Sequence, residues 1–179
     1  MHIGIIGAGQ LGRMMALSGI PLGLRFTMYD QRADVPGAAV APTVTGQFDD
    51  HRKLARFARG VDVVTFDWEN VPVESVRAIA KIRPVWPPPR SLAASQDRLS
   101  EKRLFQRLGI PVAPYSAIET RADLARAIAT IGAPGILKTR RLGYDGKGQA
   151  AIRRAADADD AFELLHGRPL LYERYVRFS

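Results

Sequence analysis

The length, composition and charge of the chain exclude several classes of protein. Its 179 residues suffice for one domain or two small ones, and an apolar content of 46% allows a buried core. The absence of cysteine excludes disulfides and thiolate metal sites, and no apolar run approaches the ~20 residues that a membrane span needs. A net charge of +8 predicts an anionic partner. Small phosphorylated ligands are expected rather than nucleic acid, because no nucleic-acid-binding motif is recognisable.

The first part of the chain predicts a Rossmann-like α/β domain with a parallel sheet. Residues 2–6 form a β-rich run, and the glycine pattern G-x-G-x-x-G follows at 7–12. A helix is expected next, because apolar or small residues recur at helical spacing: Leu11, Met15, Ser18 and Leu22. A second strand is expected over 25–29 and ends at Asp30. Strand, glycine turn and helix in this order are typical of a nucleotide-binding fold.

Asp30 leaves two interpretations open. An acid about 20 residues after such glycines holds a ribose hydroxyl in dinucleotide-dependent enzymes. Gly7, Gly9, Gly12 and Asp30 therefore favour an NAD(P)-binding oxidoreductase. In the other interpretation, Asp30 is a turn residue at the end of a strand.

The third expected strand leads to a further pair of candidate residues. The elements expected between Asp30 and residue 86 are a connection over 37–47, a helix over 49–59, a strand over 61–66, a helix over 72–82 and a short strand at 85–86. Ligands of open parallel sheets bind beyond the carboxyl ends of the strands. Glu69 and Asn70 follow the third strand, so they are expected either to contact a ligand or to cap the next helix.

Four prolines mark an expected boundary between two domains, 1–90 and 91–179. Pro84 and the prolines at 87–89 predict a semi-rigid connection that continues to Ser95. Thr120 and Asp123 have the spacing of a helix capping box. The elements expected after the boundary are helices at 97–108, from 120 and at 159–165, and strands at 114–118, 135–139, 149–152 and 170–172.

A glycine-rich stretch after the strand at 135–139 is the most distinctive feature of the second half. The strand carries Lys138, and Gly143, Gly146 and Gly148 follow with Lys147 among them. Glycine lets backbone amides approach an anion closely, so the stretch predicts a loop that closes over nucleotide phosphates. It lacks the spacing of a Walker A loop. The alternative is an ordinary glycine-rich hairpin turn with solvated basic residues.

Five stretches together resemble one family of ATP-grasp enzymes, the 5-(carboxyamino)imidazole ribonucleotide synthases. They occur in the family's order and cover nearly the whole chain: 7–14, 62–72, 96–102, 137–149 and 171–176. The most specific is Gly-Tyr-Asp-Gly-Lys-Gly-Gln at 143–149. The resemblance implies an α/β fold, with a Rossmann-like parallel-sheet pre-ATP-grasp domain followed by the first part, a small α+β subdomain, of an ATP-grasp domain.

The resemblance also implies an activity. Enzymes of this family are ligases of de novo purine biosynthesis: they join bicarbonate to the amine of 5-aminoimidazole ribonucleotide and split ATP into ADP and phosphate. ATP activates bicarbonate as carboxyphosphate. The implied partners are therefore ATP, Mg²⁺, bicarbonate and aminoimidazole ribonucleotide, in a cytoplasmic homodimer that binds neither nucleic acid nor membrane.

The family is about twice as long as this chain, which limits what can be assigned here. Its magnesium-binding carboxylates lie beyond residue 179, so we assign no metal ligand and no catalytic residue. We expect the chain to be a truncated part, inactive by itself, that binds ATP weakly or not at all. A non-catalytic nucleotide-binding module is the remaining alternative.

The motifs that match the family carry its expected binding residues onto this chain. The first glycine turn would then bind no dinucleotide, and its helix N-terminal amides at Gln10 to Gly12 could hold a phosphate. The residues implied for ATP are Arg98 and Lys138 at the phosphates, the loop residues Gly143, Tyr144, Asp145, Gly146, Lys147, Gly148 and Gln149, and the adenine hinge of Glu173, Arg174, Tyr175 and Val176. Those implied for the ribonucleotide are Gln10, Leu11, Glu69, Tyr144 and Asp145.

Overall fold

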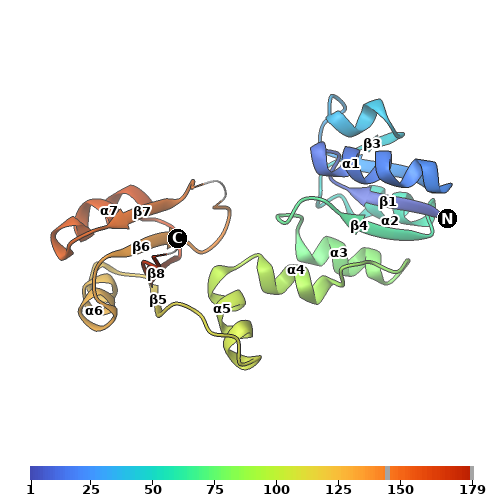
Figure 1. Cartoon of the computed structure of the whole chain (residues 1–179). Coiled ribbons are helices and arrows are strands. Elements are labelled where there is room, and N and C mark those ends of the chain that lie inside the picture. Colours follow the sequence, from blue (N-terminus) through green and yellow to red (C-terminus); the bar gives the residue numbers. More distant parts are fainter. Residues whose placement is uncertain (144–145, 178–179) are drawn as a thin grey trace. The chain divides into compact units, whose positions relative to one another are not determined.

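The structure, a computed structural model, describes residues 1–143 and 146–177. The chain folds into two compact units, Met1–Ala93 and Ala94–Ser179 (Figure 1). Tyr144 and Asp145, both predicted to contact ligands, lie outside the described residues. Among the helices of the described part, none has the length and apolar character needed to cross a membrane.

The first unit is built on a parallel sheet of four strands in the order β3-β2-β1-β4. The strands are β1 (His2–Ile6), β2 (Arg25–Asp30), β3 (Thr43–Thr45) and β4 (Val63–Phe66). β1 pairs with β2 on one side and with β4 on the other. Because all four strands run the same way, the residues that follow β1, β2 and β4 meet at one edge of the sheet.

Helices cover both faces of this sheet (Figure 1). The helices are α1 (Gln10–Gly19), α2 (His51–Arg59) and α3 (Val73–Ala80), with 3₁₀ turns at Ile20–Leu22 and Pro36–Ala39. Ala16 of α1 packs with Ile5 and Met28 on one face, whereas Phe57 of α2 and Ile79 of α3 pack with Ile6 on the other. The predicted Rossmann-like α/β architecture is confirmed.

The buried face of α1 differs from the apolar spacing that predicted the helix. Its buried residues are Gly12, Ala16 and Gly19, whereas Leu11 is 62% exposed. The helix lies so close to the sheet that a Cβ on Gly19 would be 2.4 Å from the Phe26 ring. Small residues are therefore required on the inner side. The longer side chains of α1 instead help to line an open apolar cavity of about 700 Å³, whose lining includes Leu11, Met14, Met15, Ser18, Leu22, Ile3, Ile5, Phe26 and Phe66.

Two segments expected to be connections contain regular structure. The segment at 37–47 contains β3, a three-residue edge strand too short to show a periodic pattern. The proline-rich segment before Ser95 contains helix α4 (Pro89–Ser95). Proline is tolerated at the first position of a helix, because its missing amide has no intrahelical partner there. The expected strand at 85–86 is a single bridge between Val85 and Val64.

The second unit has an antiparallel sheet in the order β5-β8-β6-β7. Its elements are α5 (Arg98–Arg107), β5 (Tyr115–Ile118), α6 (Arg121–Ile131), β6 (Gly135–Thr139), β7 (Gln149–Ile152), a 3₁₀ turn (Ala155–Asp157), α7 (Ala158–Leu165) and β8 (Leu170–Arg174). Leu137 and Tyr172 form a core with Leu124 of α6 and Ala161 of α7. The Thr120–Asp123 capping box and the α+β character of this unit are confirmed.

The two-layer packing of the second unit predicts a strong contrast between two leucines. Leu137 on β6 is fully buried, whereas Leu164 on α7 is 72% exposed. We expect Leu137→Ala to lower the free energy of unfolding by about 2–5 kcal/mol, because it leaves a cavity in the core. The matched variant Leu164→Ala should change it by less than about 0.5 kcal/mol. Urea denaturation followed by circular dichroism measures both, and equal losses would contradict the assigned core.

Candidate functional site

The first candidate site is a cavity of about 450 Å³ at the carboxyl edge of the parallel sheet. Gln10, Leu11 and Glu69, the three described residues predicted for the ribonucleotide, all line it. The other lining residues are Gly7, Gly9, Asp30, Gln31, Arg32, Phe48, Asp67 and Trp68. Ligands of open parallel sheets bind at this edge. The structure thus brings residues from the ends of three strands together around one hollow.

Asp67, which follows β4, occupies the inside of the glycine turn. Its Oδ2 accepts hydrogen bonds from the backbone N–H groups of Gly9 (3.1 Å) and Gly12 (2.9 Å). A Cβ on Gly7 would lie 1.6 Å from Asp67 Oδ1, so the turn requires glycine there. Burial raises the pKa of the Asp67 carboxyl, although the two backbone donors oppose this shift. The carboxylate therefore uses two of the amides that a bound pyrophosphate would need.

Asp30 also bonds to the protein's own backbone. Its Oδ2 accepts from the N–H of Ala8 (2.8 Å) and its Oδ1 from the N–H of Arg32 (3.2 Å). These bonds agree with the interpretation of Asp30 as a strand-end turn residue. Together with Asp67, they count against a dinucleotide in this turn.

The glycine turn still offers donors to a smaller anion. The amide of Gly12 is used by Asp67, so the expectation that it holds a phosphate is not met. The amides of Gln10 and Leu11, in the first turn of α1, have no intrahelical acceptor. The cationic side chain of Arg32 lines the same cavity. One phosphate group fits this set of donors in charge and in hydrogen-bonding character.

Glu69 and Asn70 do not cap α3. The N-cap of that helix is Pro72, and no side chain caps it. Instead the Asn70 side-chain amide donates to Glu69 Oε1 (2.9 Å), and Glu69 lines the cavity. The neighbouring Trp68 ring packs against Phe48 with 5.1 Å between ring centroids. The cavity therefore combines an aromatic wall with a carboxylate that can accept from hydroxyl or amino groups.

The second candidate site is the connection between β6 and β7, which contains the glycine loop. Lys138 and Gln149 form the last pair of the ladder, and the N–H of Thr139 donates to the carbonyl of Gly148 (2.8 Å). Gly148 has φ of +69°, and a Cβ on it would lie 2.5 Å from Thr139 Oγ1. That hydroxyl is buried and has no hydrogen-bond partner in the described part of the chain. Glycine is thus required at the base of the loop by both conformation and space.

Two arginines join the start of this loop to the N-terminus of α5. Arg140 donates to both carboxylate oxygens of Asp97, from Nε (3.1 Å) and from Nη2 (2.7 Å). Arg98 donates in return to the carbonyls of Thr139 (3.2 Å) and Gly143 (2.9 Å). Burial tends to raise the pKa of Asp97, but Arg140 and the α5 amides outweigh it and hold the pKa below its usual range. Arg98, predicted to contact phosphate, here positions the loop backbone.

Lys138 and Glu173, both predicted to bind ATP, form an ion pair. A second lysine, Lys102 of α5, bonds to the other carboxylate oxygen at 2.7 Å. The three side chains are only 13–16% exposed. Burial would raise the pKa of the Glu173 carboxyl, but the two lysines outweigh it and lower the pKa. The cluster carries one positive charge more than it has carboxylates.

The predicted adenine hinge begins inside a strand. Glu173 and Arg174 are the last residues of β8, which is two residues longer than the sequence predicted. The N–H groups of Arg174 and Tyr175 already donate to the carbonyls of Pro114 (2.9 Å) and Pro134 (3.0 Å). Tyr175 and Val176 are about half exposed. Any recognition of a base edge here would therefore use groups other than those two amides.

Three contributors to these sites were not predicted from the sequence. Asp67 directly follows the third strand, so its place at the sheet edge beside Gly7 was readable from the parallel topology. Lys102 lies four residues after Arg98 and so shares its side of α5. The Asp97–Arg140 pair spans 43 residues, and no local pattern indicates it.

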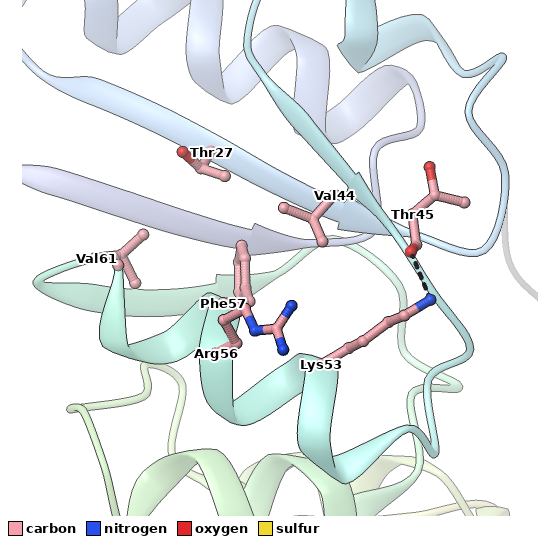
Figure 2. Close-up of a pocket in the computed structure, with 8 residues that line it drawn as sticks. Thr27, Val44, Thr45, Lys53, Arg56, Phe57 and Val61 are labelled. Atoms are coloured by element: carbon pink, nitrogen blue, oxygen red, sulfur yellow. Dashed lines mark hydrogen bonds between the residues drawn. The ribbon is translucent and has the colours of Figure 1, made fainter.

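Another cavity, of about 260 Å³, contains none of the predicted site residues (Figure 2). It lies between β3 and α2, with Val44, Phe57 and Val61 around an apolar interior. Lys53 and Thr45 also line it, and the Lys53 ammonium donates to the carbonyl of Thr45 (3.4 Å). We therefore place the candidate sites at the two glycine segments.

A parallel α/β unit with a glycine turn, followed by an α+β unit with a glycine loop between two strands, is the arrangement of the pre-ATP-grasp and ATP-grasp class. Residues 1–96 match the family described as ribonucleotide synthetase preATP-grasp domain, and residues 103–179 match the ATP-grasp domain. The chain belongs to the ribonucleotide synthetase preATP-grasp family.

Individual relatives agree with this family. An N5-carboxyaminoimidazole ribonucleotide synthase of Pseudomonas aeruginosa is 44% identical over 179 residues, which are 100% of this chain and 50% of that protein. The crystal structure of an N5-carboxyaminoimidazole ribonucleotide synthetase with ADP is similar at a TM-score of 0.95 and 36% identity, over 99% of this chain and 48% of that one. The synthase of Aspergillus clavatus, crystallised with ADP and 5-aminoimidazole ribonucleotide, is similar at a TM-score of 0.90 and 27% identity. The match covers 99% of this chain and 47% of that one.

These similarities confirm the resemblance found in the sequence. They extend over the whole of this chain and correspond to the N-terminal portion of the relatives. The chain spans about half the length of the curated relatives it matches.

The buried Asp67 carboxylate predicts an unusual dependence of stability on pH. Its folded-state pKa is raised, so the wild type should be most stable, relative to Asp67→Asn, below the ordinary pKa of about 3.9. That advantage should disappear as the pH rises through the folded-state pKa. Urea denaturation of both proteins between pH 3 and pH 7 measures the difference.

Asp62 provides a control of opposite sign in the same unit. The backbone N–H of His2 lowers the pKa of Asp62. The wild type should therefore gain stability over Asp62→Asn as the pH rises through the lowered folded-state pKa, and the gain should be nearly complete by about pH 4. Slopes of the same sign for the two aspartates would refute the environment assigned to Asp67.

Proposed function

We propose that this chain provides the ribonucleotide pocket and the phosphate-binding loop of an ATP-dependent ligase. The ligase joins bicarbonate to the amine of 5-aminoimidazole ribonucleotide and yields N5-carboxyaminoimidazole ribonucleotide, ADP and phosphate, a step of purine biosynthesis. The observation that carries the proposal is the similarity, over 99% of this chain, to a synthase crystallised with both ADP and the aminoimidazole ribonucleotide.

The cavity of the first unit suits the ribonucleotide. The amides of Gln10 and Leu11 and the Arg32 side chain offer donors to a single phosphate. Glu69 offers acceptors to ribose hydroxyls or to an amine, and Trp68 offers a ring face to an imidazole. A dinucleotide suits the same cavity poorly, because Asp67 already occupies the glycine amides.

The cationic cluster and glycine loop of the second unit suit the ATP phosphates. Lys138 leads into the loop, and Gly146 and Gly148 have positive φ angles that expose backbone amides without a side chain in the way. In the proposed reaction, ATP phosphorylates bicarbonate to carboxyphosphate, which delivers carbon dioxide to the amine. The residues of this chain would bind and orient the phosphates, because phosphoryl transfer depends on positioning and charge stabilisation.

The proposal includes Mg²⁺, a homodimer and a cytoplasmic location, as the family resemblance implies. In the described residues, no three His, Cys, Asp or Glu side chains converge in a way that could hold a metal ion. We therefore assign no metal ligand in this chain and route no step through the ion. Its ligands would belong to the part of the relatives that this chain does not cover.

Amide NMR of the ¹⁵N-labelled chain tests the proposal, because it detects weak binding. We expect ATP to shift signals of the glycine loop and β8, and 5-aminoimidazole ribonucleotide to shift signals around Gln10 and Glu69. NADH should shift neither set. A response to NADH at the first glycine turn, with none to the other two ligands, would favour the oxidoreductase alternative and overturn the proposal.

Glu69→Ala should separate the two ligands. The variant removes the acceptor in the first cavity, so we expect about tenfold weaker binding of the ribonucleotide and unchanged binding of ATP. Glu74→Ala is the matched control, because Glu74 is exposed and pairs only with its helical neighbour Arg77 in the described structure. NMR titrations of the three proteins give the dissociation constants. If Glu69→Ala weakens ATP binding and leaves the dissociation constant of the ribonucleotide unchanged, Glu69 does not contact the ribonucleotide.

Gly146→Val should act on ATP alone. Gly146 has φ of +80°, and no atom of the described residues lies within 4 Å of its Cβ position, so valine would change the loop through its backbone rather than through a clash. We expect ATP to bind about tenfold more weakly. Gly167→Val is the control: Gly167 has φ of +81° and equal space, but lies between α7 and β8. If both variants bind ATP like the wild type, the loop is not the phosphate site.

A further inference from the structure

Glu173 has two counterions on separate oxygens. Lys138 of β6 pairs with Oε1, and Lys102 of α5 pairs with Oε2 at 2.7 Å. One carboxylate needs one positive charge for neutrality, so the cluster has a spare cation. All three side chains are at most 16% exposed, so water screens this excess charge poorly.

The two lysines are held differently. The Lys102 ammonium also lies over the face of the Tyr115 ring, 5.5 Å from its centroid. The hydroxyl of that ring donates to Gln106, one turn further along α5 (2.6 Å). In the described part of the chain, Glu173 is the only hydrogen-bond or ion-pair partner of the Lys138 ammonium. Lys102 is thus fixed by two partners, and Lys138 by one.

A buried carboxylate cannot lose its last counterion cheaply. Removal of one member of a buried ion pair leaves an uncompensated charge, which is strongly destabilising. With two lysines on Glu173, one can leave while the carboxylate remains paired. The one that leaves should be Lys138, because it has fewer partners and immediately precedes the loop-forming segment.

We propose that Lys102 is a positioning residue, the permanent counterion of Glu173, and that it frees Lys138 to bind a phosphate group. The inference rests on the proposed function for the identity of the natural ligand, ATP. A phosphate at Lys138 would take up the spare positive charge of the cluster, and Lys102 would keep Glu173 ionised and in place.

Lys102→Met tests the inference, with Lys102→Arg as the conservative variant and Arg103→Met as the control. Arg103 is exposed on the same helix, so its loss removes one charge without touching Glu173. The probe is inorganic tripolyphosphate, followed by amide NMR. The second readout is the titration midpoint of the Glu173 carboxyl, measured by ¹³C NMR. The variant Glu173→Gln identifies the carboxyl signal, because that signal is missing from its spectrum.

In Lys102→Met, Lys138 becomes the only counterion and should stay on Glu173. We expect tripolyphosphate to bind about tenfold more weakly and the Glu173 midpoint to rise by about one pH unit. Lys102→Arg should restore both values, and Arg103→Met should alter neither.

Several results would overturn the inference. One is an unchanged Glu173 midpoint in Lys102→Met, and another is a raised midpoint with unchanged tripolyphosphate affinity. A wild-type chain that does not bind tripolyphosphate would overturn it as well. ATP binding that is normal in every variant would leave the proposed function intact and remove only the role of Lys102. If the chain binds tripolyphosphate as expected but does not bind ATP, the role of Lys102 stands and the proposed function is overturned.

Discussion

The bidentate pair between Asp97 and Arg140 is the interaction on which the second unit's site depends. It fixes the start of α5 to the chain just after β6, while Asp97 also caps the helix by accepting from the N–H groups of Leu99 and Ser100. The helix direction is thereby set at its first residue. Lys102, one turn further along, consequently reaches Glu173 at the end of β8. Arg98 adds to this attachment, because its guanidinium donates to the carbonyls of Thr139 and Gly143.

In each unit, one of the protein's own carboxylates occupies a place suited to a bound anion. Asp67 accepts from backbone amides at the N-terminus of α1, and Glu173 pairs with two lysines beside the glycine loop. The consequences differ because the donors differ. The amides around Asp67 are fixed in the backbone, so the carboxylate is a permanent part of the turn. A lysine side chain can turn from one acceptor to another, so the second cluster can exchange an internal partner for a ligand.

The sequence predicted much of the fold because most elements carry local signals. The β-rich run at 2–6, the Thr120 capping box and the glycine turn each depend on residues a few positions apart. The elements that the sequence did not predict lack such local signals. β3 is three residues long, and α4 begins at a proline that normally marks a connection. The site residues Gln10, Leu11 and Glu69 were found through motifs, and the structure gathers them in one cavity, but their ligand contacts remain predictions. The positions of Asp67 and Lys102 follow from the strand order and from helical spacing, but the Asp97–Arg140 pair spans 43 residues and has no local signal.

The glycine fingerprint alone does not determine the ligand of the first unit. The pattern at 7–12 provides a tight turn and a helix N-terminus, and both a dinucleotide and a monophosphate can use them. The discriminating group is Asp67, which lies 55 residues after Gly12 in the sequence and bonds to its amide. A pyrophosphate would have to displace a carboxylate from two hydrogen bonds and would face its negative charge. A single phosphate can instead use the amides of Gln10 and Leu11, so the geometry favours a ribonucleotide over a dinucleotide.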